Sequence, residues 1–249
     1  MAEGPTRQSL WRLIVRGALG TAAVCFAIVT YGWLTLPDVR PLRTEAPATT
    51  AFMRLRYAES TAAGKTPTFS QRYVRYNRIS PSLVRAVLVA EDAAFFAHDG
   101  IDYDELRATI AGNPRFWQWR GASTITQQLA KNLYLSPSRT PYRKVMEWLI
   151  ARRLEAELSK TRILELYLNL IEWGDGIWGA EAASQRYFGV AASDLTPEQA
   201  ALLAGAIPNP RVFSPARPSA ALLHRQRIIL GRMERKTPPS EKPPGPPGT

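Results

Sequence analysis

Two glutamates, Glu91 and Glu147, fall where a helix would be expected to bury apolar side chains. A helical period places Glu91 on one face with Leu88, and it aligns Glu147 with Ile150 and Leu154. An ionised carboxylate taken out of water is usually paired, shifted in pKa or functional, because desolvating it alone is costly. Both glutamates are therefore candidate catalytic residues for chemistry that needs a carboxylate of altered proton affinity.

Structural ion pairs are the alternative explanation for both carboxylates. Arg143 precedes Glu147 by one helical turn, and Arg85 is near Glu91 in the sequence. Such a pair would neutralise a buried charge without any chemistry. The residues in the neighbouring segments are needed to distinguish a catalytic carboxylate from a structural ion pair.

A polar segment at 121–132 could bind an anion or a sugar. Hydroxyls and amides crowd the expected N-terminus of a helix, where free backbone N–H groups and the helix dipole favour negative charge. The candidate ligands are Ser123, Thr124, Gln128, Lys131 and Asn132. The alternative is an ordinary capped helix with a polar face.

Three cations precede the second glutamate in the sequence: Arg139, Arg143 and Lys144. The alternative for this group is a solvated basic face, which is the usual role of such runs. The apolar and aromatic segments 163–169 and 174–179 are expected to be scaffold and groove wall, because such stripes at helical spacing are most often core.

Helices are expected to position these residues. Ser80-Pro81 and Thr196-Pro197 are typical helix N-termini, and Gly189 suits a helix end. No alternating run is long enough to predict a substantial sheet, so the expected fold class is mainly α. Apolar periodicity predicts helices at 52–57, 81–94, 102–111, 123–133, 141–158, 161–171, 179–188, 196–206 and 219–234.

An uncharged stretch at 17–36 is long enough, at 20 residues, to cross a bilayer as a helix. Arg7, Arg12 and Arg16 precede it, which predicts a cytoplasmic N-terminus and export of everything downstream. A cleaved signal peptide is the alternative. The length of the stretch and the interfacial aromatic Trp33 favour an uncleaved anchor.

The expected organisation has five parts. They are a cytoplasmic N-terminus at 1–16, a transmembrane helix at 17–36, a linker and membrane-proximal segment at 37–70, the main domain at 71–236 and a disordered Pro-rich tail at 237–249.

The net charge of +11 indicates an anionic partner, which could be nucleic acid, anionic lipid or a phosphorylated substrate. Export behind an anchor makes nucleic acid the weakest of the three, and a lipid that carries phosphates would combine the other two. Cys25 is the only cysteine, which excludes an intramolecular disulfide. His98 and His224 lie far apart without neighbouring cysteines, so the sequence predicts no zinc site.

In combination, these segments closely resemble the peptidoglycan glycosyltransferase family, whose polymerase module is also found in bifunctional penicillin-binding proteins. The resemblance runs from roughly Ser80 to Ser214, and no room follows for a transpeptidase, so the monofunctional biosynthetic form is expected. Four motifs carry it in order: Glu91–Gly100, Gly121–Asn132, Arg143–Glu147 and Ile163–Asn169. The resemblance implies a lysozyme-like helical glycosyltransferase domain with a small membrane-facing subdomain, which polymerises lipid II on the periplasmic side of the cytoplasmic (inner) membrane.

The resemblance also implies a role for each candidate residue. Glu91 would be the general base that deprotonates the 4-hydroxyl of the acceptor N-acetylglucosamine, which attacks the donor anomeric carbon with inversion. Glu147 would orient the site or help hold a divalent cation (Mg²⁺ or Mn²⁺) that bridges the substrate pyrophosphate; no cofactor is expected to be obligatory. The departing undecaprenyl pyrophosphate would be clamped by Lys131, Arg139, Arg143 and Lys144, with Ser123, Thr124, Gln128 and Asn132 as hydrogen-bonding neighbours.

The sequence departs from the family pattern at two positions. Met146 stands where some members carry a lysine, which places more weight on Lys131 and Arg139, and Ala122 replaces a second glycine. Asp92 and His98 match the first motif, and we expect His98 to hold the turn. The expected partners are lipid II, the growing glycan strand, membrane lipid and proteins of cell-wall synthesis or division.

Two other functions compete with polymerisation. A lytic transglycosylase or lysozyme-like hydrolase also uses an inward glutamate on a helical scaffold, but it has no diphosphate to neutralise. A catalytically silent scaffold that binds cell-wall precursor would not need both glutamates in apolar stripes. The basic cluster favours synthesis.

Overall fold

The computed structural model describes residues 7–103, 107, 123–138 and 140–235 of the 249-residue chain. The chain divides into two compact units, Met1–Asp38 and Val39–Thr249. Arg139, Ala122 and the expected tail lie outside the described residues, as does most of the helix expected at 102–111.

The first unit contains one long helix, α1 (Arg7–Leu34). Its segment Ile14–Gly32 is 19 residues long and apolar enough to span a membrane, although a signal sequence has the same properties. The expected N-terminal apolar helix is therefore confirmed, but it begins at Arg7 rather than at residue 17.

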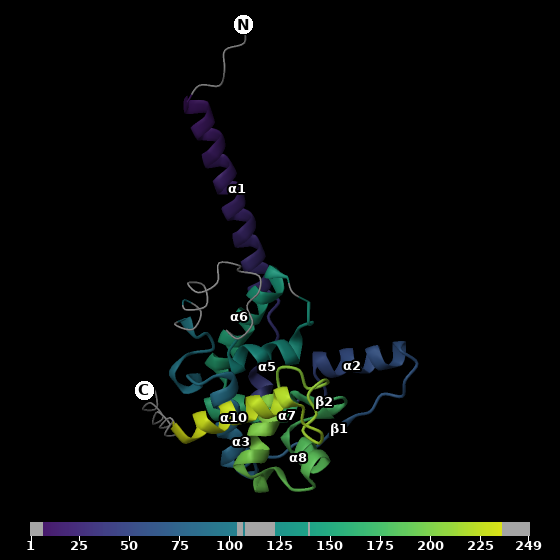
Figure 1. The fold of residues 1–249 in the computed structure, drawn as a ribbon. Helices are drawn as coiled ribbons and strands as arrows, with labels where there is room; N and C mark the ends of the chain where they lie inside the picture. The colour runs from purple at the N-terminus through teal and green to yellow at the C-terminus, as the bar shows by residue number, and fades with distance from the viewer. Residues whose placement is uncertain (1–6, 104–106, 108–122, 139, 236–249) are drawn as a thin grey trace. The chain divides into compact units, whose positions relative to one another are not determined.

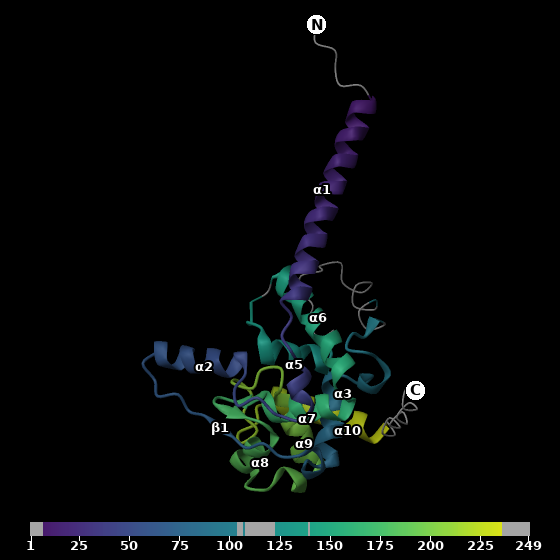
Figure 2. The same ribbon diagram turned by 180° about the vertical axis from the view of Figure 1, so that it is seen from behind.

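The second unit is built mainly from helices, which confirms the predicted fold class (Figure 1, Figure 2). Its α-helices are α2 (Ala51–Ala62), α3 (Pro81–Glu91), α5 (Ile125–Tyr134), α6 (Pro141–Glu157), α7 (Lys160–Leu170), α8 (Ala180–Phe188), α9 (Pro197–Ala206) and α10 (Ala220–Arg235).

Two groups of helices form the core of this unit. α9 packs against α3 and α10, and α5 packs against α6 and α7. Leu83, Leu129, Leu154 and Leu164 have no exposed surface, so one apolar face of each helix supplies the core. In both views α2 projects to one side of these groups (Figure 1, Figure 2).

A small sheet accompanies the helices. β1 (Ser70–Gln71) pairs in parallel with β3 (Ile177–Trp178), which pairs antiparallel with β2 (Glu172–Gly174). Gly176 adopts φ +71° in the turn between β2 and β3, where a Cβ would lie 2.3 Å from the carbonyl oxygen of Thr68. Strands of two and three residues are too short for alternation to reveal them.

The predicted helix ends are confirmed at several positions. Ser80 caps α3 through Ser82 N–H, and Thr196 forms a capping box with Gln199 at the start of α9. Gly189 ends α8 in the left-handed region, at φ +70°.

α3 ends at Glu91 instead of residue 94, and Asp92 is the reason. Its carboxylate contacts His98 Nε2 (3.0 Å) and accepts the backbone N–H of Ile125 (3.0 Å). These contacts require Asp92 to leave helical geometry, at φ −164° and ψ 81°. Glu91 is consequently the last helical residue, next to the start of α5.

The segment expected to be a linker, 37–70, belongs in large part to the packed second unit. Val39, Leu42 and Met53 are buried. The short helix expected at 52–57 is longer, because Thr50 caps it at one end and it continues to Ala62. This helix, α2, carries residues that approach the candidate site.

Candidate active site

Glu91 is half-buried at the end of α3 and is held by a neighbouring amide. Gln128 Nε2 of α5 donates a hydrogen bond to Glu91 Oε2 (2.9 Å). The other carboxylate oxygen, Oε1, has no hydrogen-bond partner among the described residues. An oxygen in that position can accept a proton from a bound hydroxyl.

Burial raises the pKa of Glu91 above its ordinary value. The hydrogen bond from Gln128 and the positive charges of Arg225 and Lys131 act in the opposite direction, without cancelling the effect of burial. A raised pKa makes the ionised carboxylate a stronger base than a solvated glutamate.

Glu147 on α6 is buried, with 3% of its surface exposed, and it pairs with two cations. Arg143 Nη1 contacts Oε2 and Lys144 Nζ contacts Oε1. The ion-pair explanation therefore holds for Glu147, whose charge orients both cations. Its direct participation in chemistry stays a prediction.

Lys144 extends this network toward the start of α5. Its Nζ donates to Ser123 Oγ (3.2 Å) and to Gln127 Oε1 (2.9 Å). Ser123 is thus brought beside Lys144, and its contact with a substrate stays a prediction. Gln127 was not among the predicted residues, although it belongs to the same motif.

Lys131 carries a positive charge without a carboxylate in contact within the part of the chain that the structure describes. Its Nζ lies 5.9 Å from the centroid of the Phe52 ring on α2. Burial and the charges of Arg143 and Lys144 lower its pKa, while Glu147 raises it. Burial makes the charged form of Lys131 less favourable, and an anionic ligand would stabilise that charge.

Two buried polar atoms, Arg143 Nε on α6 and Asn132 Oδ1 on α5, lack hydrogen-bond partners in the described part of the chain. Native proteins rarely leave such atoms unsatisfied, so each indicates a ligand or a water molecule. The arrangement around Lys131 and Arg143 therefore has unused capacity to bind polar, negatively charged groups.

Thr124 has a structural role at the start of α5. Its hydroxyl donates to the carbonyl oxygen of Gly100 (2.7 Å) and accepts from Gln127 N–H (3.2 Å). The hydroxyl hydrogen is thus already used within the protein. Substrate binding by Thr124 stays a prediction, and this geometry does not favour it.

His98 holds the turn after α3, as expected. Its Nδ1 accepts the N–H of Gly100 (3.2 Å), so Nε2 carries the hydrogen that faces Asp92. The pair connects the end of α3 to the start of α5 and keeps Glu91 next to Gln128.

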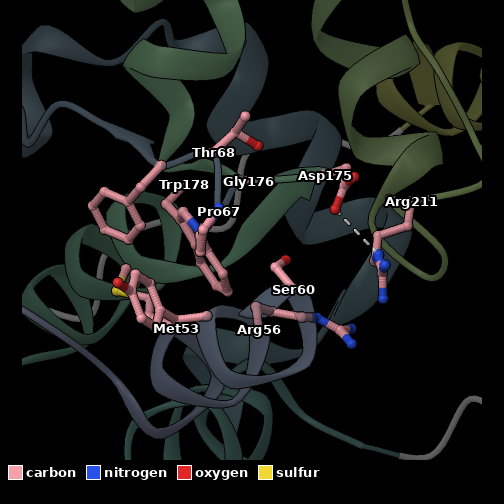
Figure 3. Close-up of a pocket in the computed structure, with 11 residues that line it drawn as sticks. Met53, Arg56, Ser60, Pro67, Thr68, Asp175, Gly176, Trp178 and Arg211 are labelled. Carbon is pink, nitrogen blue, oxygen red and sulfur yellow. Dashed lines mark ion pairs between the residues drawn. The ribbon is translucent and has the colours of Figure 1, made fainter. Parts of the chain in front are cut away.

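Segment 174–179, expected to be a groove wall, lines a pocket beside α2 (Figure 3). Arg56 of α2 contacts Glu59 (2.8 Å) and Glu172 (3.0 Å). Arg211 contacts Glu59 (3.5 Å) and Asp175 (3.4 Å), the latter drawn as a dashed line in Figure 3. This ionic network ties α2, which carries Phe52, to the β2–β3 turn.

We expect Glu172→Gln to flatten the pH dependence of stability. Burial raises the pKa of Glu172, and its Oε1 has no partner among the described residues. The folded protein therefore binds this proton more tightly than the unfolded chain, so stability falls as pH rises from about 4.3 through the raised pKa. Urea unfolding at pH 4.5 and 7.5 measures the change.

The parent should lose more stability between these pH values than the Glu172→Gln variant. Glu59→Gln is the matched control, because it removes an exposed carboxylate that contacts the same Arg56. We expect Glu59→Gln to change the stability of the protein little at either pH. Equal pH dependence in the parent and Glu172→Gln would contradict the prediction.

The described residues do not build a metal site by themselves. No group of three or more His, Cys, Asp and Glu side chains among them could hold an ion. Both oxygens of Glu147 are engaged by Arg143 and Lys144. Among the described residues, Glu147 is thus engaged in ion pairs and is not presented as a metal ligand.

The fold and the site together define a mainly helical enzyme that sets a half-buried carboxylate of raised pKa beside a cluster of cations. Residues 59–234 match the family described as Transglycosylase. The chain belongs to this family and is a glycosyltransferase.

Curated relatives with the name "Biosynthetic peptidoglycan transglycosylase" cover nearly the same length. The protein of Nitrosomonas europaea is 45% identical over 230 residues, which are 92% of each chain. That of Nitrosomonas eutropha is 44% identical over 211 residues, which are 84% of this chain and 86% of the relative. That of Laribacter hongkongensis is 43% identical over 215 residues, which are 86% of this chain and 94% of the relative.

Proposed function

We propose that this glycosyltransferase polymerises lipid II into β-1,4-linked glycan strands in cell-wall synthesis, with inversion and release of undecaprenyl pyrophosphate. The observation that carries the proposal is the half-buried Glu91, with one free oxygen, in a site that also holds Lys131 without a carboxylate in contact among the described residues. A base and an excess of positive charge are what this transfer requires.

In the proposed reaction, Glu91 Oε1 accepts the proton of the acceptor 4-hydroxyl. The oxygen forms a bond to the donor anomeric carbon as the bond from that carbon to the pyrophosphate oxygen breaks. The leaving group takes the bonding electrons, and the negative charge grows on its oxygen. Lys131, Arg143 and Lys144 stabilise this charge.

Glu147 acts on the leaving-group side in this scheme, because it fixes Arg143 and Lys144 in place. Arg139, which lies outside the described residues, is proposed to complete the clamp. Ser123, Gln128 and Asn132 are proposed to supply polar neighbours. We propose no obligatory cofactor, and a divalent cation would be bound mainly by the pyrophosphate.

We further propose that α1 is an uncleaved anchor in the inner membrane. Arg12 and Arg16 at its N-terminal side support a cytoplasmic N-terminus and a periplasmic catalytic domain. This placement brings the enzyme to its lipid-linked substrate. Partners in cell-wall synthesis or division are proposed, and nucleic acid is not.

Purified full-length protein in detergent should convert labelled lipid II into polymer that a muramidase degrades. The same protein should release no muropeptides from mature, lipid-free peptidoglycan, because that glycan carries no diphosphate for the cations to bind. Digestion of mature peptidoglycan without polymer formation would favour the lytic alternative. Binding of lipid II without either reaction would favour a silent scaffold.

A further inference from the structure

Tyr167 is a buried tyrosine on α7 that reaches the candidate site through one hydrogen bond. Its side chain has no exposed surface. Its hydroxyl donates to Gln128 Oε1 (2.8 Å), and the opposite end of the same amide donates to Glu91 Oε2 (2.9 Å). Three side chains from α7, α5 and α3 thus form a continuous chain that ends at the candidate base.

The Tyr167 hydroxyl determines which end of the Gln128 amide faces Glu91. Gln128 Oε1 is the only acceptor that the described residues offer to the hydroxyl hydrogen. If the amide turned over, this hydrogen would lose its acceptor in a fully buried position, which is unfavourable. The turned amide would also place its oxygen against the Glu91 carboxylate and the Ser123 carbonyl, which now face its Nε2 (2.9 and 3.5 Å).

Gln128 is the only residue that donates a hydrogen bond to the Glu91 carboxylate in the described part of the chain. The charged groups that act on Glu91 come from three elements: Asp92 follows α3, Lys131 lies on α5 and Arg225 lies on α10. Asp92 raises the pKa of Glu91, whereas Lys131 and Arg225 lower it. The amide adds a directional contact to the ionised form, which these more distant charges do not provide.

We infer that Tyr167 is a positioning residue: through Gln128 it holds the Glu91 carboxylate ionised, with Oε2 engaged and Oε1 free for the acceptor hydroxyl. The inference rests on the proposed function for its catalytic meaning. It assigns Gln128 a second role beyond substrate contact. It also assigns a positioning role to Tyr167, which lies in a segment expected to be only scaffold.

The inference is tested first without substrate, by titrating Glu91 in the full-length protein in detergent. Carbon-13 labelling of glutamate side chains and NMR follow its carboxyl signal, which is assigned by its absence in Glu91→Gln. Gln128→Met keeps the side-chain length and removes the N–H donor, so the titration midpoint should rise by about one pH unit. Tyr167→Phe removes only the hydroxyl and should raise the midpoint in the same direction.

The double variant distinguishes positioning from a general structural effect. If Tyr167 acts through Gln128, Tyr167→Phe should add nothing in the Gln128→Met background. Tyr187→Phe is the matched control, because it deletes another tyrosine hydroxyl with a protein acceptor, the carbonyl oxygen of Trp173 (3.3 Å). This control should leave the Glu91 titration unchanged.

Polymerisation assays then connect the titration to turnover. The acidic limb of the pH–rate profile should move to higher pH in Tyr167→Phe and Gln128→Met, by the same amount as the NMR midpoint. An unshifted Glu91 midpoint in Gln128→Met, or equal shifts from Tyr167→Phe in the parent and in the Gln128→Met background, would overturn the inference. A parent that titrates as expected but makes no polymer would refute the proposed function and leave the hydrogen-bonded chain standing.

Discussion

Replacing Glu91 with Gln should reduce glycan polymerisation by about 10²–10⁴-fold and leave the protein folded. The amide keeps the shape of the carboxylate and can still accept the hydrogen bond from Gln128 Nε2. It cannot take a proton from the acceptor hydroxyl at the pH of the reaction. The loss should therefore appear in turnover more than in the binding of lipid II.

Stability provides the second measurement for this variant. Burial raises the pKa of Glu91, so ionised Glu91 lowers the stability of the folded protein at neutral pH. A neutral amide removes this cost, and the thermal midpoint at pH 7 should be unchanged or higher. Initial rates with labelled lipid II and thermal unfolding of the same samples give both quantities. A folded Glu91→Gln protein with the parent rate would remove Glu91 from the role of base.

The side-chain periodicity of single helices predicted a large part of this site. Glu147 lies on the buried face of α6 together with Ile150 and Leu154, as the helical period required. The pairing of Arg143 with Glu147 also followed from the sequence, because residues four apart meet on a helix surface. Helix geometry alone was sufficient to predict both the burial of Glu147 and its pairing with Arg143.

Contacts between distant segments were not predictable in this way. Asp92 ends α3 because its carboxylate accepts a hydrogen bond from Ile125, which is 33 residues away. Tyr167 and Arg225 act on Glu91 only because α7 and α10 fold next to the site. Neither residue differs in sequence from an ordinary core tyrosine or surface arginine.

The roles of the polar residues in segment 123–132 show the same limit. Their types predicted a cradle for a ligand, but hydroxyls and amides also serve as caps and connectors. Thr124 turns out to cap α5, and Gln128 joins Tyr167 to Glu91. Only the three-dimensional partners distinguish such groups from Asn132, whose buried Oδ1 has no partner in the described residues.

Removal of the Lys131 ammonium should reduce turnover by about 10²–10³-fold, as expected for the loss of one preorganised group that stabilises a developing negative charge. Lys131→Met keeps most of the apolar stem of the side chain and removes the charged Nζ, which lies 5.9 Å from the centroid of the Phe52 ring. The loss should be larger in turnover than in donor binding, because negative charge accumulates on the leaving group as its bond to the sugar breaks. Single-turnover rates measure the effect on turnover, and binding of a non-hydrolysable donor measures the effect on donor affinity.

The same substitution should not destabilise the protein, and this distinguishes it from the loss of a structural lysine. Burial lowers the pKa of Lys131, so the unfolded chain binds this proton more tightly and the charged form costs stability at neutral pH. The thermal midpoint of Lys131→Met at pH 7 should equal or exceed that of the parent. The difference should disappear as pH rises toward about 10.4, where the unfolded lysine also loses its proton.

Lys160→Met is the matched control with the opposite expectation. Lys160 Nζ contacts Glu155 (2.8 Å) and lies 4.4 Å from the centroid of the Phe95 ring. Its removal leaves the mostly buried Glu155 with the hydroxyl of Thr126 as its remaining partner among the described residues, at a cost of roughly 1–3 kcal/mol. We therefore expect Lys160→Met to lower the stability of the protein and leave the polymerisation rate unchanged. Lys131→Met should leave stability unchanged and lower the polymerisation rate. Equal losses of stability in both variants would show that Lys131 supports the fold. An undiminished rate in Lys131→Met would show that it does not stabilise the departing diphosphate.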